Sequence, residues 1–458
     1  MDVRKVENCF VLCYTKMIFD QKPGVFCRRY VKGIRTMANH DLQKHSFEVS
    51  STILFALTMV CNLFNYLYQI IMGNLLTTAQ YGTMNALFSL VTLIGVPMEI
   101  LRLTASKYTA HYMALEESRK ISKLLKKLMG ISAGIALLVL VVGMPLAPWV
   151  ADILQIENVG YVRMAILVAA VSCLSPVLMG TLQGLQWFTA YSIQNIFNSA
   201  GKLVFGVALV WFGVVLYGNL MGIMLGLLLG ILYAAYVLRG FWKVRSSETV
   251  TLGRQDILHY LSTAFWAQML TLALTNGDVL LVKAFAANEE VTGIYSSAMT
   301  LGKIPIFASS AIVAVLFPVV AAQQAVGKDT LKVFKKALLY GGSISAMCMA
   351  GLILFGKQVV LLLFGQRYAD AIALMVPVGC FILPLTFITI LMNYLTALGN
   401  AHFLAATLGG GFVMIVILVG FFHETAAQML YIMGGVLAVV TIANLVKVFC
   451  FDTRHTET

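Results

Sequence analysis

The sequence predicts an all-α integral membrane protein, with twelve transmembrane helices in two pseudo-symmetric six-helix bundles around a central cavity. Composition, the recurrence of apolar runs and an internal repeat support this prediction. Of the 458 residues, 60% are hydrophobic and 11% are charged, and the mean hydropathy is +0.86. A soluble chain of this length could not bury so much apolar side chain, because its surface must meet water. In a bilayer, helices are the expected spanning form because each satisfies its own backbone hydrogen bonds.

Apolar runs of about 20 residues, the length that a helix needs to cross the hydrocarbon, recur from residue 51 onward. In the first half, the predicted spans are residues 51–72, 81–112, 124–150, 161–182, 191–216 and 218–238. In the second half, they are residues 257–285, 292–322, 333–355, 371–398, 403–422 and 428–449. Two lobes of six helices, 51–240 and 257–450, follow from this count.

The segments outside the lobes are more polar. Residues 1–50 contain no span-length apolar run and lack the features of a signal peptide, so we expect a poorly ordered cytoplasmic segment, with Met37 as an alternative start. Residues 241–256 are expected to form a cytoplasmic linker, and residues 451–458 a cytoplasmic tail. Cys9 and Cys13 have no second pair at ligand spacing, so no metal or other cofactor is expected.

The connections between spans alternate in charge. The basic connections contain Arg119, Lys120, Lys123, Lys126 and Lys127; Arg239, Lys243, Arg245 and Arg254; and Lys328, Lys332, Lys335 and Lys336. The connections between them are short and contain Asp152, Glu157, Glu289, Glu290, Asp370 and Glu424. Because basic loops stay in the cytoplasm, both termini are predicted to be cytoplasmic. The net charge of +12 therefore reflects topology, and no nucleic-acid partner is expected.

An internal repeat relates the two halves. The stretch from Tyr81-Gly82 to Lys126-Lys127 resembles the stretch from Thr292-Gly293 to Lys335-Lys336. Each copy begins with a polar turn and a glycine, continues through a long helix interrupted by proline (Pro97 or Pro305), and ends in a basic amphipathic stretch. The two copies are six spans apart and so have the same orientation. Such halves around a central cavity are typical of transporters.

Glycine and proline have expected structural roles within the spans. Gly218, Gly222, Gly226 and Gly230 recur every four residues, which predicts close packing of a neighbouring helix rather than a hinge. The prolines within spans leave backbone carbonyls without a hydrogen-bond donor. They are interpreted as points at which the helices could bend during alternating access. These prolines are Pro97, Pro176, Pro305, Pro377 and Pro384.

Several segments resemble a known family over roughly residues 50–450. They are Asn65-Tyr66-Leu67-Tyr68, Leu75-Leu76-Thr77, Ala79-Gln80-Tyr81-Gly82, Gly277-Asp278-Val279, Thr292-Gly293-Ile294-Tyr295 and Leu316-Phe317-Pro318. They are similar to the oligosaccharide flippase branch of the multidrug/oligosaccharidyl-lipid/polysaccharide exporter superfamily. The resemblance implies two bundles in a V shape that alternate access and carry an undecaprenyl-pyrophosphate-linked oligosaccharide to the outer leaflet, for cell-surface polysaccharide biosynthesis in a bacterial plasma membrane. It also implies the lipid bilayer and other polysaccharide-assembly proteins as partners.

Charged residues within spans are the candidate site. Each charged side chain costs roughly 2.5–3.5 kcal/mol to insert into the middle of the membrane, so its presence indicates a structural or functional role. Arg102, Lys202 and Lys303 are predicted to face the cavity and bind the pyrophosphate, since Arg offers a bidentate fork and Lys a point charge. Glu99 and Asp278 complete the set, as substrate contacts or as ligands of a coupling cation.

Structural interpretations of the same charges stay open. Glu99 and Arg102 are three residues apart on a helix and could neutralise each other. Asp278 could pair with a lysine across the cavity. Lys107 and Lys283 lie near span ends, where extension of the side chain to the membrane surface is expected.

Three other functions compete with glycan-lipid transport. Flipping of lipid II is chemically very close. A cation-coupled multidrug antiporter of the same superfamily would need acidic groups in the cavity, whereas mid-span bases outnumber acids here. A membrane glycan polymerase or ligase would need outer-face catalytic groups and a sizeable outer loop, and the sequence offers neither a Ser/His/Asp arrangement nor a zinc motif. We therefore expect a transporter and not an enzyme.

Overall fold

The computed structural model describes residues 40–450, except 116, 244–253, 287 and 326–328. The predictions for residues 1–39, most of the linker and the tail therefore lie outside the described residues. The chain divides into two compact units, Met1–Ala56 and Leu57–Thr458. In the first unit, residues 40–56 are helical. All contacts discussed below lie within the second unit.

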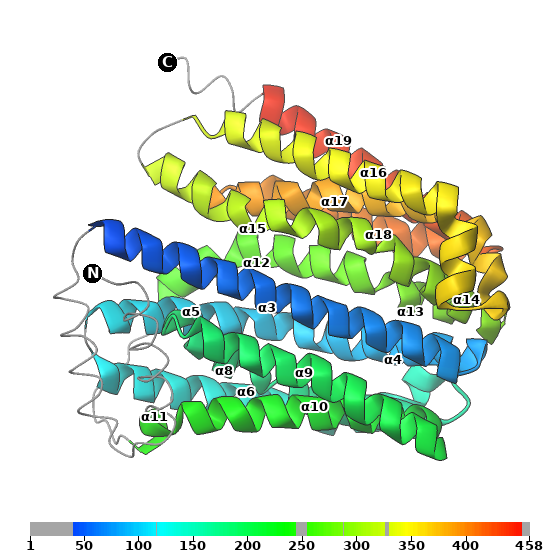
Figure 1. The fold of residues 1–458 in the computed structure, drawn as a ribbon, viewed down its shortest axis with the longest axis horizontal. Coiled ribbons are helices and arrows are strands. Elements are labelled where there is room, and N and C mark those ends of the chain that lie inside the picture. The colour runs from blue at the N-terminus through cyan, green and yellow to red at the C-terminus, as the bar shows by residue number, and fades with distance from the viewer. Residues whose placement is uncertain (1–39, 116, 244–253, 287, 326–328, 451–458) are drawn as a thin grey trace, which may run out of the picture. The chain divides into compact units, whose positions relative to one another are not determined.

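The predicted all-α fold is confirmed, since the described residues form helices and contain no strand (Figure 1). The first half comprises α3 (His40–Leu75), α4 (Thr78–Gly95), η1 (Val96–Met98), α5 (Glu99–Ala114), α6 (Ser118–Ile153), α7 (Val159–Ser172), α8 (Ser175–Gly184), α9 (Phe188–Leu209), η2 (Val210–Val214), α10 (Val215–Val237) and α11 (Arg239–Lys243). The second half comprises α12 (Arg254–Asn276), α13 (Asp278–Phe285), α14 (Glu289–Gly302), α15 (Ile304–Ala325), α16 (Leu331–Leu363), η3 (Gln366–Leu374), α17 (Met375–Ala397), α18 (His402–Phe421) and α19 (Ala426–Cys450).

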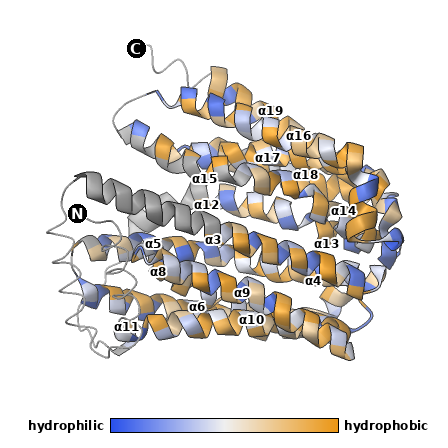
Figure 2. Cartoon of the chain, in the orientation of Figure 1, coloured by the Kyte–Doolittle hydropathy of each residue, from blue (hydrophilic) through white to orange (hydrophobic). Residues whose placement is uncertain are grey.

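Eight helical runs in the described part of the chain are long and apolar enough to cross a membrane, or nine with one pair bent by 45°. Figure 2 shows helices such as α10 and α18 coloured as hydrophobic along most of their length. One run, Phe188–Val237, has 50 residues, about 75 Å of helix against a hydrocarbon layer of about 30 Å. It contains α9 and α10, which reverse at Gly213 (φ +86°) and pack along each other. The total of twelve spans stays a prediction.

Three of the in-span prolines lie where helices break. Pro97 lies in the 3-10 turn η1 between α4 and α5, and Pro176 follows the break between α7 and α8. Pro305 follows the break between α14 and α15. Pro377 and Pro384 lie within the continuous helix α17. Equivalent breaks at Pro97 and Pro305 support the repeat, because both occur in the same place in the two copies.

The glycine stripe of α10 packs against α9 as predicted. A side chain at Gly226 would meet the backbone nitrogen of Lys202 at 2.7 Å, and one at Gly222 would overlap Gly206. Gly218 and Gly230 similarly approach Leu209 and Asn198. Small residues let the two backbones approach closely, which increases van der Waals packing where lipid provides no hydrophobic driving force.

The two ends of the second unit differ in charge. The helices α6 and α16 begin at the same end, which we call the basic end (Figure 1). The basic end has Arg119, Lys120, Lys123, Lys126, Lys127, Lys332, Lys335 and Lys336 at the starts of these helices. The other end, which we call the acidic end, has Asp152, Glu157, Glu289, Glu290, Asp370 and Glu424. The assignment of the basic end to the cytoplasm stays a prediction.

The two copies of the repeat touch each other at the acidic end. The helix α4 starts with a capping box between Thr77 and Gln80, and α14 starts with an Asn288 cap that accepts from the backbone N–H of Val291. The helices then cross so closely that a side chain on Gly82 would lie 2.6 Å from the backbone nitrogen of Gly293. The repeat signature Tyr-Gly/Thr-Gly therefore marks a backbone contact between the halves.

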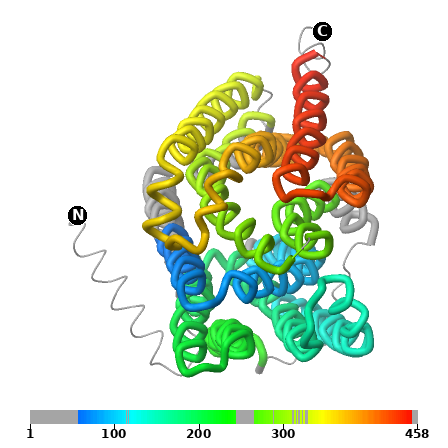
Figure 3. The backbone as a smooth tube through the Cα atoms, turned by 90° about the vertical axis from the view of Figure 1, so that its right-hand side faces the viewer, coloured from blue at the N-terminus to red at the C-terminus, as the bar shows by residue number. Residues whose placement is uncertain are grey.

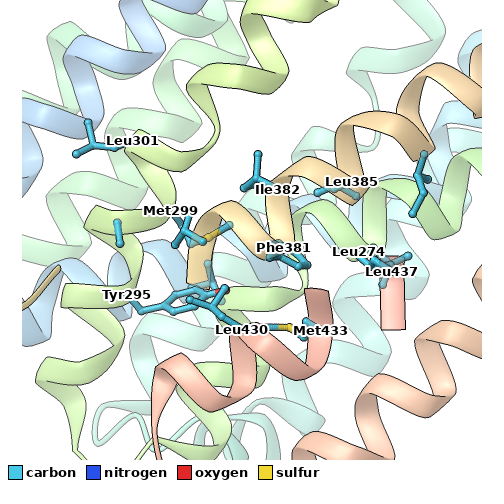
Figure 4. Close-up of a cluster of buried hydrophobic side chains, with 14 of the residues drawn as sticks. Leu274, Tyr295, Met299, Leu301, Phe381, Ile382, Leu385, Leu430, Met433 and Leu437 are labelled. Atoms are coloured by element: carbon cyan, nitrogen blue, oxygen red, sulfur yellow. The ribbon is translucent and has the colours of Figure 1, made fainter. Parts of the chain in front are cut away.

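The hydrophobic core follows the same division. Two clusters of buried residues lie within the first half. One lies mainly between α5, α6 and α8, and the other mainly between α4, α6 and α7. The largest cluster belongs mainly to the second half and includes Tyr295, Met299, Phe381 and Met433 (Figure 4). It extends into α3 and α4 of the first half. The halves thus share a core near the acidic end.

Candidate functional site

Lys202 lies in the interior of the first half, and the described part of the chain gives it no acidic partner. Lys202 is 8% exposed, and its Nζ lies 4.5 Å from the centroid of the Tyr68 ring and 4.9 Å from that of the Phe88 ring. Within the described residues, no carboxylate lies within 4.0 Å of it. Two aromatic faces stabilise an ammonium by about 0.5–2 kcal/mol each, which only partly offsets the loss of water. This lysine therefore lacks a full counter-charge.

The fold around Lys202 holds it rigidly. Its backbone lies where α9 and α10 cross at Gly201 and Gly226, so the helix cannot shift without a clash. Tyr68 is 1% exposed, and its hydroxyl accepts a hydrogen bond from Asn219 of α10 at 2.5 Å. The α3, α4, α9 and α10 helices thus fix one cation among aromatic rings.

Glu99 and Arg102 form an ion pair at the start of α5. The Arg102 Nε donates to Glu99 Oε1 at 2.7 Å, and its Nη1 donates to Gln183 Oε1 of α8 at 2.6 Å. The Glu99 side chain is 25% exposed and the Arg102 side chain is 20% exposed. The neutralising interpretation of the three-residue spacing is therefore realised, and the Arg102 side chain as a whole stays 20% exposed.

Asp278 lies at the bend between α12 and α13. It is 2% exposed, and its Oδ2 accepts a hydrogen bond from the Tyr295 hydroxyl of α14 at 3.0 Å. Its Oδ1 has no hydrogen-bond partner among the described residues. Its position at the N-terminus of α13 stabilises a negative charge through the helix dipole. One buried carboxylate oxygen is therefore available to a proton or a cation.

Lys303 provides a counter-charge for Asp278. It ends α14 at the break before Pro305, is half-buried, and lies close enough to interact electrostatically with Asp278. The structure thus brings Glu99 to Arg102 and Asp278 toward Lys303, and it leaves Lys202 among aromatic rings. The candidate residues form three environments, and the central cavity that would join them stays a prediction.

Lys283 differs from its sequence-based expectation. The side chain does not extend to a membrane surface; it is 1% exposed, and its Nζ donates to Glu289 Oε1 at 2.8 Å. The reason is that Glu289, the first residue of α14, reaches the end of α13 and supplies the counter-charge there. Lys107, by contrast, is exposed on α5, and its extension to the membrane surface stays a prediction.

The buried position of Lys283 leads to a stability prediction. Glu289→Gln is expected to lower the free energy of unfolding by about 1–3 kcal/mol, because it leaves an ammonium buried without a counter-charge. A fully buried pair would lose about 3–5 kcal/mol, but the Glu289 side chain is 44% exposed. The measurement is thermal unfolding in detergent, with the exposed neighbour Glu290→Gln as the matched control. Equal melting temperatures for the two variants would contradict the prediction.

A polar cluster, which sequence reasoning missed, joins the two halves. It consists of Tyr66, Gln69, Tyr81, Asn85 and Thr300. The Tyr81 hydroxyl donates to Gln69 Oε1 and lies 3.1 Å from Thr300 Oγ1, and Gln69 Nε2 donates to Asn85 Oδ1. The Tyr66 hydroxyl donates to the Thr300 carbonyl at 3.2 Å. Tyr66 and Tyr81 belong to the motifs that carry the family resemblance. Those motifs were therefore the feature of the sequence from which this polar cluster could have been predicted.

The candidate spans of the described residues define a multi-pass membrane protein, and solved structures share its fold. An inward-facing multidrug resistance MATE family transporter of the MOP superfamily has a TM-score of 0.72 at 15% identity, covering 86% of this chain and 96% of that one. An outward-facing MATE family transporter of the MOP superfamily has a TM-score of 0.63 at 15% identity, covering 87% and 93%. A MATE structure in the straight conformation has a TM-score of 0.60 at 16% identity, covering 89% and 94%. At these identities the likeness shows the fold.

The sequence itself identifies the family. The profile of the family described as polysaccharide biosynthesis protein matches residues 49–324, more than half of the chain. The chain therefore belongs to the polysaccharide biosynthesis protein family and has the fold of MOP-superfamily transporters. No curated protein matches the sequence significantly.

Proposed function

We propose that this protein is a flippase that moves an undecaprenyl-pyrophosphate-linked oligosaccharide from the cytoplasmic to the outer leaflet by alternating access. In this proposal the basic end faces the cytoplasm of a bacterial cell, and the product is used for cell-surface polysaccharide. Membership of the polysaccharide biosynthesis family supports a glycan substrate. The higher TM-score with the inward-facing than with the outward-facing transporter, 0.72 against 0.63, fits a state open toward the basic end.

The observation that carries the proposal is the buried cation Lys202. A lysine in the interior of a membrane protein is retained at a cost, and its neighbours Tyr68 and Phe88 provide no negative charge. A pyrophosphate that passes between the halves would supply that charge, and Arg102, whose side chain is 20% exposed, would add a guanidinium. The lipid tail can remain in the bilayer while the headgroup moves along this path.

Asp278 is proposed as the coupling residue. Its free Oδ1 can take up a proton or a cation, and Lys303 lies near enough to sense the change. Neutralising Asp278 would release Lys303 from electrostatic attraction, so that Lys303 becomes available to the pyrophosphate. Glu99 is the weaker coupling candidate, because Arg102 already occupies it.

The multidrug antiporter is the second candidate function, favoured by the MATE neighbours. A cationic drug needs an acidic group that is free to bind it. Glu99 is paired with Arg102, and Asp278 faces Tyr295 and the nearby Lys303. Lys202 adds a positive charge that would repel such a drug. The balance of buried charge therefore favours an anionic substrate. Lipid II, which has the same pyrophosphate, is the other alternative.

A reconstituted transport assay tests the proposal. Proteoliposomes that contain the full chain are loaded with a fluorescent undecaprenyl-pyrophosphate oligosaccharide, with lipid II, or with a cationic dye, in separate arms. We expect protein-dependent flipping of the oligosaccharide lipid. Dye transport without flipping would establish the antiporter instead, and flipping of lipid II alone would reassign the substrate. Liposomes with protein that has been heat-denatured provide the control for leakage.

A further inference from the structure

The C-terminal ends of two helices, one from each half, meet at the acidic end. These are α3, which ends at Leu75, and α16, which ends at Leu363. Figure 3, which views the helices from that end, shows the end of α3 in blue beside the turn after α16 in gold. Both helix ends have carbonyl groups without a partner inside their own helix, and both have a negative partial charge from the helix dipole.

Residues from the opposite half satisfy the carbonyls of α3. The Tyr368 hydroxyl donates to the Gly73 carbonyl at 3.0 Å. The Arg367 Nη2 donates to the Asn74 carbonyl at 2.9 Å, and its Nη1 donates to the Leu76 carbonyl at 3.3 Å. One cation of the second half therefore caps the helix terminus of the first half.

The capping is reciprocal. The Asn74 Nδ2 donates to the carbonyl of Leu363, the last residue of α16, at 2.7 Å. Beneath these bonds, a side chain on Gly73 would meet the Phe364 ring at 2.6 Å, so the backbone of α3 lies directly on that ring. Phe364 also packs on Tyr368, with ring centroids 5.5 Å apart. Hydrogen bonds at the surface and aromatic packing below it connect the same two helix ends.

The C-terminal ends of α3 and α16 have the same partial negative charge, so they would repel each other without a cation between them. Arg367 is therefore the residue that makes the contact favourable. Arg367 and Asn74 are exposed, so water can replace their bonds at little net cost. The surface hydrogen bonds of such an arrangement can therefore break and re-form, whereas a buried ion pair at the same place would be harder to open.

We propose that these residues form a releasable lock, which keeps the acidic end of the transport path closed. We call Gly73, Asn74, Leu76, Leu363, Arg367 and Tyr368 the terminal lock. The inference rests on the proposed alternation of access and adds the device that sets its balance. When the terminal lock opens, the carbonyls of α3 and α16 turn to water, and α3 and η3 separate with their own halves.

Distance measurement between spin labels tests the lock without any substrate. The labels are placed at Phe212 in η2 of the first half and at Phe421, the last residue of α18 in the second half, which are 81% and 78% exposed. They are introduced as Phe212→Cys and Phe421→Cys in a full chain whose native cysteines are replaced. Arg367→Ala is expected to raise the ratio of the population with the longer label distance to the population with the shorter one about tenfold. This change corresponds to ~1.4 kcal/mol in the free energy of opening. Arg367→Lys is expected to have a smaller effect, because an ammonium cannot reach two carbonyls in a fork.

Two further variants make the result decisive. Lys357→Ala removes an exposed cation from the same helix-end region of α16 and should leave the distances unchanged. Asn74→Ala removes the bond to Leu363 and should shift the distances in the same direction as Arg367→Ala. Distances in Arg367→Ala and Asn74→Ala equal to those in Lys357→Ala would overturn the lock. A lock that opens as expected in a protein that flips no glycan lipid would instead refute the proposed function alone.

Discussion

Replacing Lys202 by methionine is expected to reduce the flipping rate of the lipid-linked oligosaccharide by at least about tenfold. A hydrogen bond to a charged group contributes about 1.5–3 kcal/mol, which corresponds to roughly ten- to 150-fold. Methionine has a similar length and no charge, so the variant removes the cation and keeps most of the packing against Tyr68 and Phe88. The measurement is the reconstituted flipping assay.

The same variant is expected to fold normally. The free energy of unfolding should change by no more than about 1 kcal/mol, because the lost cation–π contacts are offset by the removal of a buried charge. No ion pair within the described residues is broken, since Lys202 has no carboxylate within 4.0 Å. Transport and stability therefore separate, which a purely structural lysine would not allow.

Lys357→Met is the matched control for Lys202→Met, because it makes the same chemical change at an exposed site. It should retain full flipping. If Lys202→Met flips at the parental rate, the pyrophosphate does not bind this lysine. If the variant loses several kcal/mol of unfolding free energy along with transport, Lys202 is part of the scaffold.

Gly293→Ala is expected to lower the free energy of unfolding by about 1–3 kcal/mol, the range for an added methyl group in a packed interior. Its new Cβ would overlap the Thr78 carbonyl, and backbone atoms cannot move aside as a flexible side chain can. Gly82→Ala should have a similar effect from the other side of the crossing, where Gly293 N lies 2.6 Å from the Cβ position. The measurement is thermal unfolding in detergent.

The two glycine variants should not be additive. Either methyl group forces α4 and α14 apart, so the second causes less additional strain than the first. Gly435→Ala in α19 is the matched control, because no atom beyond its chain neighbours and its own helix backbone lies within 4 Å of its Cβ position; it should be neutral or stabilising by up to about 1 kcal/mol. Equal melting of Gly293→Ala and Gly435→Ala would mean that the helices have room to separate.

Interactions between residues close together in the chain could be predicted from the amino-acid sequence. The three-residue spacing of Glu99 and Arg102 indicated that they could pair, and the four-residue glycine period predicted the close approach of a neighbouring helix, which is α9. Helical geometry places such residues on one face whatever the rest of the chain does. Lys283 shows the limit of this reasoning, since Glu289 reaches it only through a turn whose geometry the sequence did not indicate.

Long-range contacts could not be inferred in this way. The rings around Lys202 come from α3 and α4, and Gln183, which accepts from Arg102, comes from α8. The terminal lock depends on Arg367, an exposed residue of a short helix that no spacing rule relates to Asn74. No local pattern encodes which helices meet, because that choice depends on packing across the whole bundle.

The class of protein was thus decided by composition and periodicity. A bilayer accepts only apolar segments with satisfied backbones, and this leaves the chain few alternatives to a bundle of spanning helices. The charge state of the interior was decided by tertiary packing. Glu99 and Arg102 neutralise each other, Asp278 and Lys303 interact electrostatically, and Lys202 lacks an acidic partner within the described part of the chain. The energy of a Coulomb interaction falls with the distance between the charges in space, and only the folded chain determines those distances.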